Sequence, residues 1–405
     1  MNKKISLGIA IGLMALVAAA TFIITYNYSM KVFNNTVKSV SEKEEVYTKL
    51  SEMDKYVRAN YIGTLDENTL MNSIMEGYID GISDEYADYY TADEYAEILR
   101  QDSGVTIGLG ITWEKENSGY IKVLSVNEGS SSANAGVAAG DIITAVNNTD
   151  VIAYEGGYDE ASALLNCTEG TKVKLHIKRV NQQGISEFFA VDVVSEKTEI
   201  VSVTSRMIDN VGYVKITAFN GKTPDQFRSA INGLLESGAE ALVFDVRDNT
   251  GGLIEALQGS IDCILGDKDV VTAKFMNKEE VVVKTTEAEK ISMPMTVIIN
   301  GNTASCAELF ALALKDEADA QIVGAQSFGK GVMQYTHKLN GGAAVKVTVA
   351  TLSTAKSGEF NGTGIKPHFD VALPADTDLS VLSEEEIMQQ DTQLLKAIEV
   401  VQTIK

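Results

Sequence analysis

Two residue types that together perform acyl transfer stand close to one another in the second half of the chain. Ser305 follows the apolar run VIIN (residues 297–300) and a polar turn, and Lys330 comes 25 residues later in the string SFGKG. A serine hydroxyl attacks a carbonyl only when a base takes its proton, and histidine, lysine or an N-terminal amine serves as that base. The chain has three histidines and no plausible Asp-His pair, so Lys330 is the candidate base for Ser305.

A lysine base has to be shielded from water. An ordinary lysine has a pKa of about 10.4 and is protonated at neutral pH, and burial among apolar groups lowers that pKa. Gly329 and Gly331 allow the backbone to fold tightly around Lys330. We expect Phe328 and Val332 to supply the apolar wall.

The same chemistry needs two NH donors aimed at the carbonyl oxygen that becomes negative. Cys306, directly after the serine at an expected helix N-terminus, offers one NH in a favourable dipole. The second is expected from Gly251 or Gly252, which end the string DVRDNTGG after a buried strand. Open α/β sheets place their sites at such strand ends.

Simpler readings fit the same segments. Ser305 and Glu308 match the S-x-x-E capping box, in which the serine only accepts a helix-terminal NH, and taken alone this is the commoner case. The double glycine fits an ordinary turn. The Gly-Lys-Gly string is typical of a solvated loop, and it does not meet the spacing G-x-x-x-x-G-K-[ST] of a phosphate loop because Gly331 stands where a hydroxyl is needed.

The elements around these residues alternate between strands and helices. Apolar, nearly continuous strands such as ALVF (residues 241–244) indicate a buried sheet in an α/β layer. The expected strands are 212–216, 241–246, 297–300 and 321–323, and the expected helices are 224–236, 253–265 and 306–314.

A different pattern precedes this layer. Short strands at residues 120–126, 140–147 and 171–180 and a helix at 158–166 predict a small β-rich module. The strings GLGI (Gly108, Leu109, Gly110 and Ile111), AGV (135–137) and GDIITAVN (140–147) resemble those of a PDZ domain. A glycine-flanked loop lets successive NH groups point at one carboxylate, and the strand beside it accepts a peptide as an added strand.

The ordered motifs over roughly residues 35–400 resemble the carboxyl-terminal processing proteases, which are tail-specific serine peptidases. They are the PDZ module, DVRDNTGG, NGNTASCAEL and SFGKGVMQ. The resemblance implies a catalytic set of Ser305, Lys330 and Gln334, an α/β core of the crotonase-like (ClpP/crotonase) type, and a PDZ module that gates access. Thr250 stands where that family usually has proline, and Cys306 where it often has a smaller residue.

Composition limits the alternatives. The net charge of -22 argues against a nucleic-acid partner, and three scattered cysteines without metal-ligand spacing argue against a disulfide framework or a zinc site. We expect no cofactor. The expected division of the 405 residues is a membrane anchor (1–30), a helical region (31–103), the PDZ module (104–184), the protease core (185–375) and a C-terminal helical segment (376–405).

The N-terminus predicts a single-pass anchor. Lys3 and Lys4 precede an apolar run over residues 5–26, long enough to span a bilayer core. An uncleaved anchor is favoured over a cleaved signal peptide because the run continues through residues 22–24, beyond the small residues 18–20. The catalytic part would then lie outside the cytoplasm, on the bacterial cell surface.

These expectations describe a membrane-anchored serine endopeptidase whose PDZ module captures protein C-terminal tails, and a homodimer is the favoured assembly. Two rivals remain open. One is a catalytically inactive PDZ scaffold on a protease-like core, which would not need a buried lysine. The other is an acyl-transferring enzyme, which would not need a PDZ module.

Overall fold

The computed structural model describes residues 7–127, 129–180, 184–286, 290–374, 377, 379 and 384–404. The chain divides into two compact units, residues 1–74 and 75–405. The first unit contains α1 (Leu7–Asn60) and the start of α2 (Glu67–Asp80). Near the end of α1, Arg58 donates to Asp54 at 2.8 Å and to Glu67 at 2.6 Å. Both helices overlap the region expected to be helical, residues 31–103.

The expected membrane anchor lies partly outside the described residues. Residues 1–6 are not described, and neither are the side chains of residues 7–13. Among the described residues, no helix combines the length and the apolar character that crossing a membrane requires.

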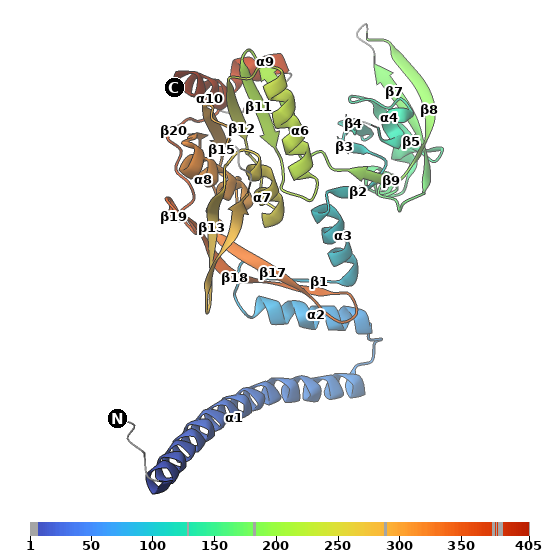
Figure 1. Ribbon diagram of the computed structural model, residues 1–405. Helices are drawn as coiled ribbons and strands as arrows, with labels where there is room; N and C mark the ends of the chain where they lie inside the picture. The colour runs from blue at the N-terminus through green and yellow to red at the C-terminus, as the bar shows by residue number, and fades with distance from the viewer. Residues whose placement is uncertain are drawn as a thin grey trace. The chain divides into compact units, whose positions relative to one another are not determined.

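The PDZ module is an antiparallel sheet with its own core (Figure 1). Its strand order is β3 (Ile111–Lys115), β4 (Ile121–Val126), β5 (Ile142–Val146), β7 (Lys172–Val180) and β8 (Ser186–Val194), with α4 (Ser131–Asn134) and α5 (Tyr158–Ala163) beside it. β8 pairs with β7 over nine residues, so the module extends past the expected boundary at residue 184. A ribbon of β2 (Val105–Gly108) and β9 (Glu196–Glu199) joins its two ends.

The region expected to form the protease core (185–375) contains the expected α/β layer. Its sheet has the order β10 (Val203–Ile208), β11 (Val211–Ile216), β12 (Ala241–Asp245), β15 (Met295–Ile299), β16 (Gln321–Gly324) and β20 (Phe369–Asp370), and it is parallel from β11 onward. The apolar strands pack on α6 (Thr223–Glu236), α7 (Ile254–Asp262) and α8 (Cys306–Ala318) through a cluster that contains Phe219, Phe227, Phe244 and Phe310. The expected fold class of mixed α/β with a PDZ domain is confirmed.

A second sheet in the same unit was not expected from sequence. It consists of β1 (Asp88–Tyr90), β13 (Lys268–Phe275), β14 (Glu279–Thr285), β17 (Val332–Lys338), β18 (Ala344–Thr354) and β19 (Gly358–Glu359). β1 belongs to the region predicted to be helical, and it pairs antiparallel with β18. This pairing brings the segment around Tyr86 to the hairpin that follows Lys330.

The C-terminal segment covers the other face of the parallel sheet. Within the expected C-terminal helical segment (376–405), the structure has two helices, α9 (Glu384–Gln390) and α10 (Thr392–Thr403), separated by Asp391. Asp391 is buried and accepts the NH of Leu394 at 2.9 Å, so it caps α10. Leu394, Ala397 and Val401 then pack on the sheet, so α10 covers this face of the domain.

A buried ion network holds α10 in place. Arg247 donates to Asp245 at 2.5 Å and to Asp391 at 2.7 Å, and Tyr213 donates to Asp245 at 2.7 Å. Burial alone would raise the pKa of Asp245, but the charge and hydrogen bonds of Arg247 lower it overall. The stabilisation from Asp245 is therefore present above its unfolded pKa of about 3.9 and is lost as the pH falls through its lower folded pKa.

We predict that Asp391→Ala lowers the free energy of unfolding by about 3 kcal/mol, because it leaves part of a buried guanidinium unpaired and removes a helix cap. Glu399→Ala removes the exposed pair with Lys396 on the same helix and should leave the stability unchanged. Denaturant unfolding followed by circular dichroism measures both. Equal stabilities of the two variants would contradict a structural role for the network.

Candidate active site

Ser305 lies at a sharp turn between β15 and α8 in an unusual backbone conformation. Its φ is 56° and its ψ is -120°, a left-handed region that non-glycine residues rarely adopt. Two ordinary helix caps in this chain have a different backbone. At Thr91 φ is -60° and ψ is 167°, and at Ser130 φ is -68° and ψ is 162°. Ser305 therefore departs from the cap conformation that its S-x-x-E pattern predicts. A strained serine at a strand-to-helix turn is typical of an exposed nucleophile.

Glu308 connects the serine turn to the lysine loop. Its carboxylate is fully buried. Oε2 accepts the NH of Ser305 at 2.9 Å and the NH of Lys330 at 2.8 Å. Oε1 accepts the Ser327 hydroxyl at 2.5 Å and the NH of Gly329 at 2.8 Å. Burial raises the pKa of Glu308, and these four hydrogen bonds to the carboxylate oppose the rise.

The oxyanion donors predicted from sequence differ in availability. The NH of Gly251 already donates to Asn249 Oδ1 at 2.8 Å. Among the described residues, the amides of Gly252 and Cys306 have no acceptor. Gly252 is also exposed to solvent. The pair Gly252 and Cys306 thus fits an oxyanion hole in this conformation, whereas Gly251 supports the turn.

The double glycine is required by close packing. A Cβ on Gly251, whose φ is 106°, would lie 2.9 Å from the Cβ of Ser305. A Cβ on Gly252, whose φ is 136°, would lie 2.1 Å from the carbonyl oxygen of Phe219. Cys306 Sγ donates to the carbonyl of Gly252 at 3.2 Å, and burial raises the pKa of this thiol to about 12. The cysteine is therefore a neutral packing group and no rival nucleophile.

Lys330 is half-buried, and of the two residues predicted to form its apolar wall only Val332 is buried. Phe328 is 53% exposed and cannot shield the amine, although Val332 is buried as expected. The Lys330 ammonium lies 4.7 Å from the ring centroid of Tyr86 instead. Burial lowers the pKa of Lys330, and the nearby positive charge of Lys346 lowers it further. Both effects favour the neutral amine that a general base requires.

The two glycines beside Lys330 allow another loop to approach. A Cβ on Gly329 would lie 2.7 Å from the nitrogen of Gly364, and one on Gly331 would lie 2.6 Å from the nitrogen of Asn361. Gly331 also donates to Asn361 Oδ1 at 3.1 Å. The expected tight backbone around Lys330 is confirmed.

Gln334 lies on β17, next to a bulge between Met333 and Gln334. Its Nε2 donates to Thr348 Oγ1 at 3.2 Å, and Thr348 Oγ1 donates to Asp84 Oδ1 at 3.0 Å. Within the described residues, no hydrogen bond joins Lys330 Nζ to Ser305 or to Gln334. Glu308 thus links the Ser305 turn to the Lys330 loop, and Gln334 lies on β17, the strand that follows this loop. The described structure shows no direct bond among the Ser305, Lys330 and Gln334 side chains in this conformation.

Sequence reasoning missed three residues of this site. From sequence, Glu308 was assigned only to a capping box with Ser305. Tyr86 and Asp84 belong to the string DEYADYY (residues 84–90), for which the sequence suggested no chemistry. The concentration of aromatic and acidic side chains was a visible signal, but nothing local indicates that this string contacts residues about 250 positions away.

The predicted peptide-binding loop connects β2 to β3. Leu109 is buried, and Gly110 packs so closely on Ser130 that a Cβ would lie 2.1 Å from the serine Cβ. Among the residues described, the amides of Leu109 and Gly110 have no acceptor, and β3 pairs with β4 alone. Free NH groups in the loop and an open strand edge at β3 are what the predicted peptide-binding role of Gly108, Leu109, Gly110 and Ile111 requires.

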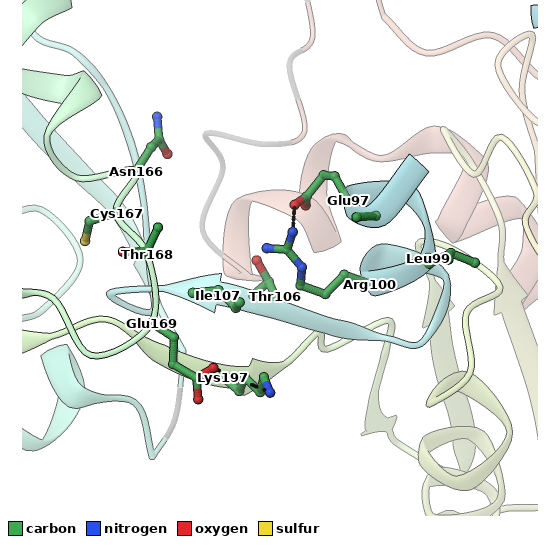
Figure 2. A pocket seen from close by; sticks show the side chains of 11 residues that line it. Glu97, Leu99, Arg100, Thr106, Ile107, Asn166, Cys167, Thr168, Glu169 and Lys197 are labelled. Carbon is green, nitrogen blue, oxygen red and sulfur yellow. Dashed lines mark ion pairs between the residues drawn. The ribbon is translucent and has the colours of Figure 1, made fainter. Parts of the chain in front are cut away.

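A separate hollow of about 910 Å³ lies between α3 (Ala92–Asp102) and the loop that follows α5 (Figure 2). Its charged side chains pair with one another: Arg100 with Glu97 at 2.6 Å, and Lys197 with Glu169 at 3.4 Å. None of the predicted catalytic residues lines this hollow. Across the described residues, no three His, Cys, Asp or Glu side chains are grouped as a metal site would need.

Comparison with known proteins decides the family. The sequence profile of peptidase family S41 matches residues 210–371, and that of a PDZ domain matches residues 122–179. The chain is 31% identical to the carboxy-terminal processing protease CtpA of Bacillus subtilis over 92% of this chain and 78% of that protein. The chain belongs to the carboxy-terminal processing proteases of family S41.

Further relatives agree with this assignment. A "Probable CtpA-like serine protease" of Staphylococcus haemolyticus is 27% identical over 96% of this chain and 77% of that protein. A solved structure described as a "Putative S41 protease" from Bacteroides fragilis matches with a TM-score of 0.53 and 15% identity, covering 82% of this chain and 90% of that one. The S41 fold with a PDZ domain is thus found both in the sequence comparison and in the structure.

We predict that Glu308→Gln lowers kcat about tenfold or more, because the side-chain amide nitrogen cannot accept the NH groups that one carboxylate oxygen now holds. Glu94→Gln is the matched control, since Glu94 completes an ordinary capping box with Thr91 away from Ser305 and Lys330. It should leave kcat unchanged. Steady-state cleavage of a fluorogenic peptide compares the two, and equal rates would show that Glu308 only caps α8.

Proposed function

We propose that this S41 protease cleaves peptide bonds with Ser305 as nucleophile and Lys330 as general base. The observation that supports this most directly is the buried Glu308 carboxylate, which accepts the backbone NH groups of both residues. Ser305 attacks the carbonyl carbon while Lys330 takes the hydroxyl proton, and the amides of Gly252 and Cys306 stabilise the oxyanion. Lys330 then returns the proton to the leaving amine, and a water activated by the same amine hydrolyses the acyl-enzyme.

Gln334 is the third member of this proposed set. Its amide would orient the Lys330 amine toward Ser305 once substrate closes the site, since catalytic hydrogen bonds are often long before substrate binds. Its position on the strand that directly follows the lysine loop supports this role.

The PDZ module is proposed to recognise the C-terminal tail of a protein substrate. The amides of Leu109 and Gly110 are available for a carboxylate, and the edge of β3 is available for an added strand. Lys115, the last residue of β3, lies 5.4 Å from the ring centroid of Tyr158 at the start of α5. β3 and α5 therefore form the two sides of the groove that an extended tail would enter.

Three further proposals concern the fold of the core, the attachment to a membrane and the assembly. The core is proposed to be crotonase-like, in line with its parallel sheet and the helices packed on it. The apolar run over residues 5–26 behind Lys3 and Lys4 supports a single-pass membrane anchor with the protease outside the cytoplasm. Exposed Val46, Met53 and Tyr56 on α1 support a homodimer through this helix.

The proposed mechanism predicts that Ser305→Ala and Lys330→Arg both abolish cleavage of an unstructured protein with an apolar C-terminus. Alanine has no nucleophile, and arginine cannot release a proton at accessible pH. Gel-based cleavage assays with the full chain measure both variants. Cleavage by Ser305→Ala at the wild-type rate would falsify the nucleophile assignment, and an active Lys330→Arg would exclude a neutral amine as the base.

The pH dependence provides a separate prediction. Because the neutral amine is the base, kcat/KM should rise as the pH rises through the pKa of Lys330, which lies below its ordinary value. Lys346→Met removes the neighbouring positive charge, so the Lys330 pKa should increase and the rising limb should move to higher pH. Lys338→Met on the same hairpin should not move it. An unshifted limb in Lys346→Met would contradict the proposed electrostatic coupling.

A further inference from the structure

We infer that Asp84 and Thr348 are positioning residues of the peptidase reaction, which fix the side-chain amide of Gln334 so that its carbonyl oxygen faces the Lys330 amine. This inference rests on the proposed function of Ser305, Lys330 and Gln334. It assigns a role to the string DEYADYY, which lies more than 200 residues before the catalytic set in the sequence.

The direction of the hydrogen bonds carries the argument. An ionised carboxylate only accepts hydrogen bonds, and a hydroxyl has a single proton to donate. Thr348 Oγ1 donates that proton to Asp84 Oδ1 at 3.0 Å. Its remaining capacity is to accept, so the atom of Gln334 that approaches it at 3.2 Å has to be the donor Nε2. The carbonyl Oε1 of Gln334 is left to accept a hydrogen from the lysine amine.

Asp84 is itself held in place by backbone donors. Its Oδ2 accepts the NH of Thr348 at 2.8 Å, and its Oδ1 accepts the NH of Tyr86 at 3.1 Å. Burial alone would raise the pKa of Asp84, but these bonds and the charge of Lys346 lower it overall, so the carboxylate remains an acceptor at neutral pH. The Asp84 carboxylate can only accept, so it fixes which atom donates in the hydrogen bond from Thr348 to Asp84 and in the one from Gln334 to Thr348.

The same segment also contacts the lysine. Tyr86, whose NH bonds Asp84, places its ring 4.7 Å from Lys330 Nζ. The pairing of β1 with β18, with Asp88 opposite Lys346 and Tyr90 opposite Ala344, holds the segment along the hairpin. One short stretch therefore positions two of the three proposed catalytic residues: it shields the amine through Tyr86 and orients Gln334 through Asp84.

An amide at position 84 would remove this control. The side chain of an asparagine both donates and accepts, so Thr348 Oγ1 is free to donate to Gln334 Oε1 instead. Gln334 then turns over and presents its NH₂ group to the lysine, where it repels the ammonium form and, in the neutral amine, occupies the lone pair that has to take the Ser305 proton. The nucleophile, the oxyanion donors and the peptide-binding loop are not touched by this change.

The test compares four variants of the full chain on one fluorogenic peptide. Asp84→Asn and Thr348→Val should each lower kcat about tenfold to a hundredfold with KM within about twofold of wild type. Thr348→Ser keeps the hydroxyl and should retain the wild-type kcat. Thr351→Val, on the same strand and without a bond to Gln334, should also retain it. Thermal unfolding checks that Thr348→Val and Thr351→Val have similar Tm values.

Two results would overturn the inference. One is a kcat of Asp84→Asn and Thr348→Val within about twofold of wild type. The other is an equal loss in Thr348→Ser and Thr348→Val, because a role through the hydroxyl requires rescue by serine. In either case an inactive Ser305→Ala measured beside them keeps the proposed function intact. Wild-type cleavage by Ser305→Ala would instead reject the proposed function itself.

Discussion

The arrangement of the site depends on one buried carboxylate. Glu308 lies in the first turn of α8 and accepts hydrogens from the serine turn on one side and from the lysine loop on the other. A buried charge without partners would cost several kcal/mol, so the carboxylate constrains both loops to supply their donors. The relative position of the proposed nucleophile and the proposed base is thereby set by the core of the domain.

The second constraint is the desolvation of Lys330, and it comes from a remote part of the chain. The loop around the lysine is rich in glycine and exposes Phe328, so it cannot bury the amine by itself. Tyr86 supplies the ring that the loop lacks. The segment of residues 84–90 therefore belongs to the same compact unit as the proposed catalytic residues, and β1 is the element that attaches it.

These two constraints explain which parts of the structure the sequence predicts. The strands β12 and β15 and the helix α8 follow from continuous apolar runs with clear turns between them, because a buried parallel sheet imposes that pattern locally. The hairpin of β17 and β18 was missed, since its strands are half exposed and its partner β1 lies about 250 residues away. Phe328 was a wrong choice of wall for the same reason: the true neighbour is set by strand pairing that no local pattern encodes.

The competing interpretations of Ser305 illustrate the limit of a motif. Thr91 with Glu94 and Ser305 with Glu308 share the pattern S/T-x-x-E, and in both the glutamate accepts the NH of the first residue. Glu94 is exposed and its printed side-chain bonds lie within its own box, whereas Glu308 is buried and also bonds three residues of the lysine loop. The backbone differs accordingly, with φ of -60° at Thr91 and 56° at Ser305. A capping box is thus compatible with the proposed role of Ser305 as nucleophile, because the glutamate of the box holds the serine in its strained turn.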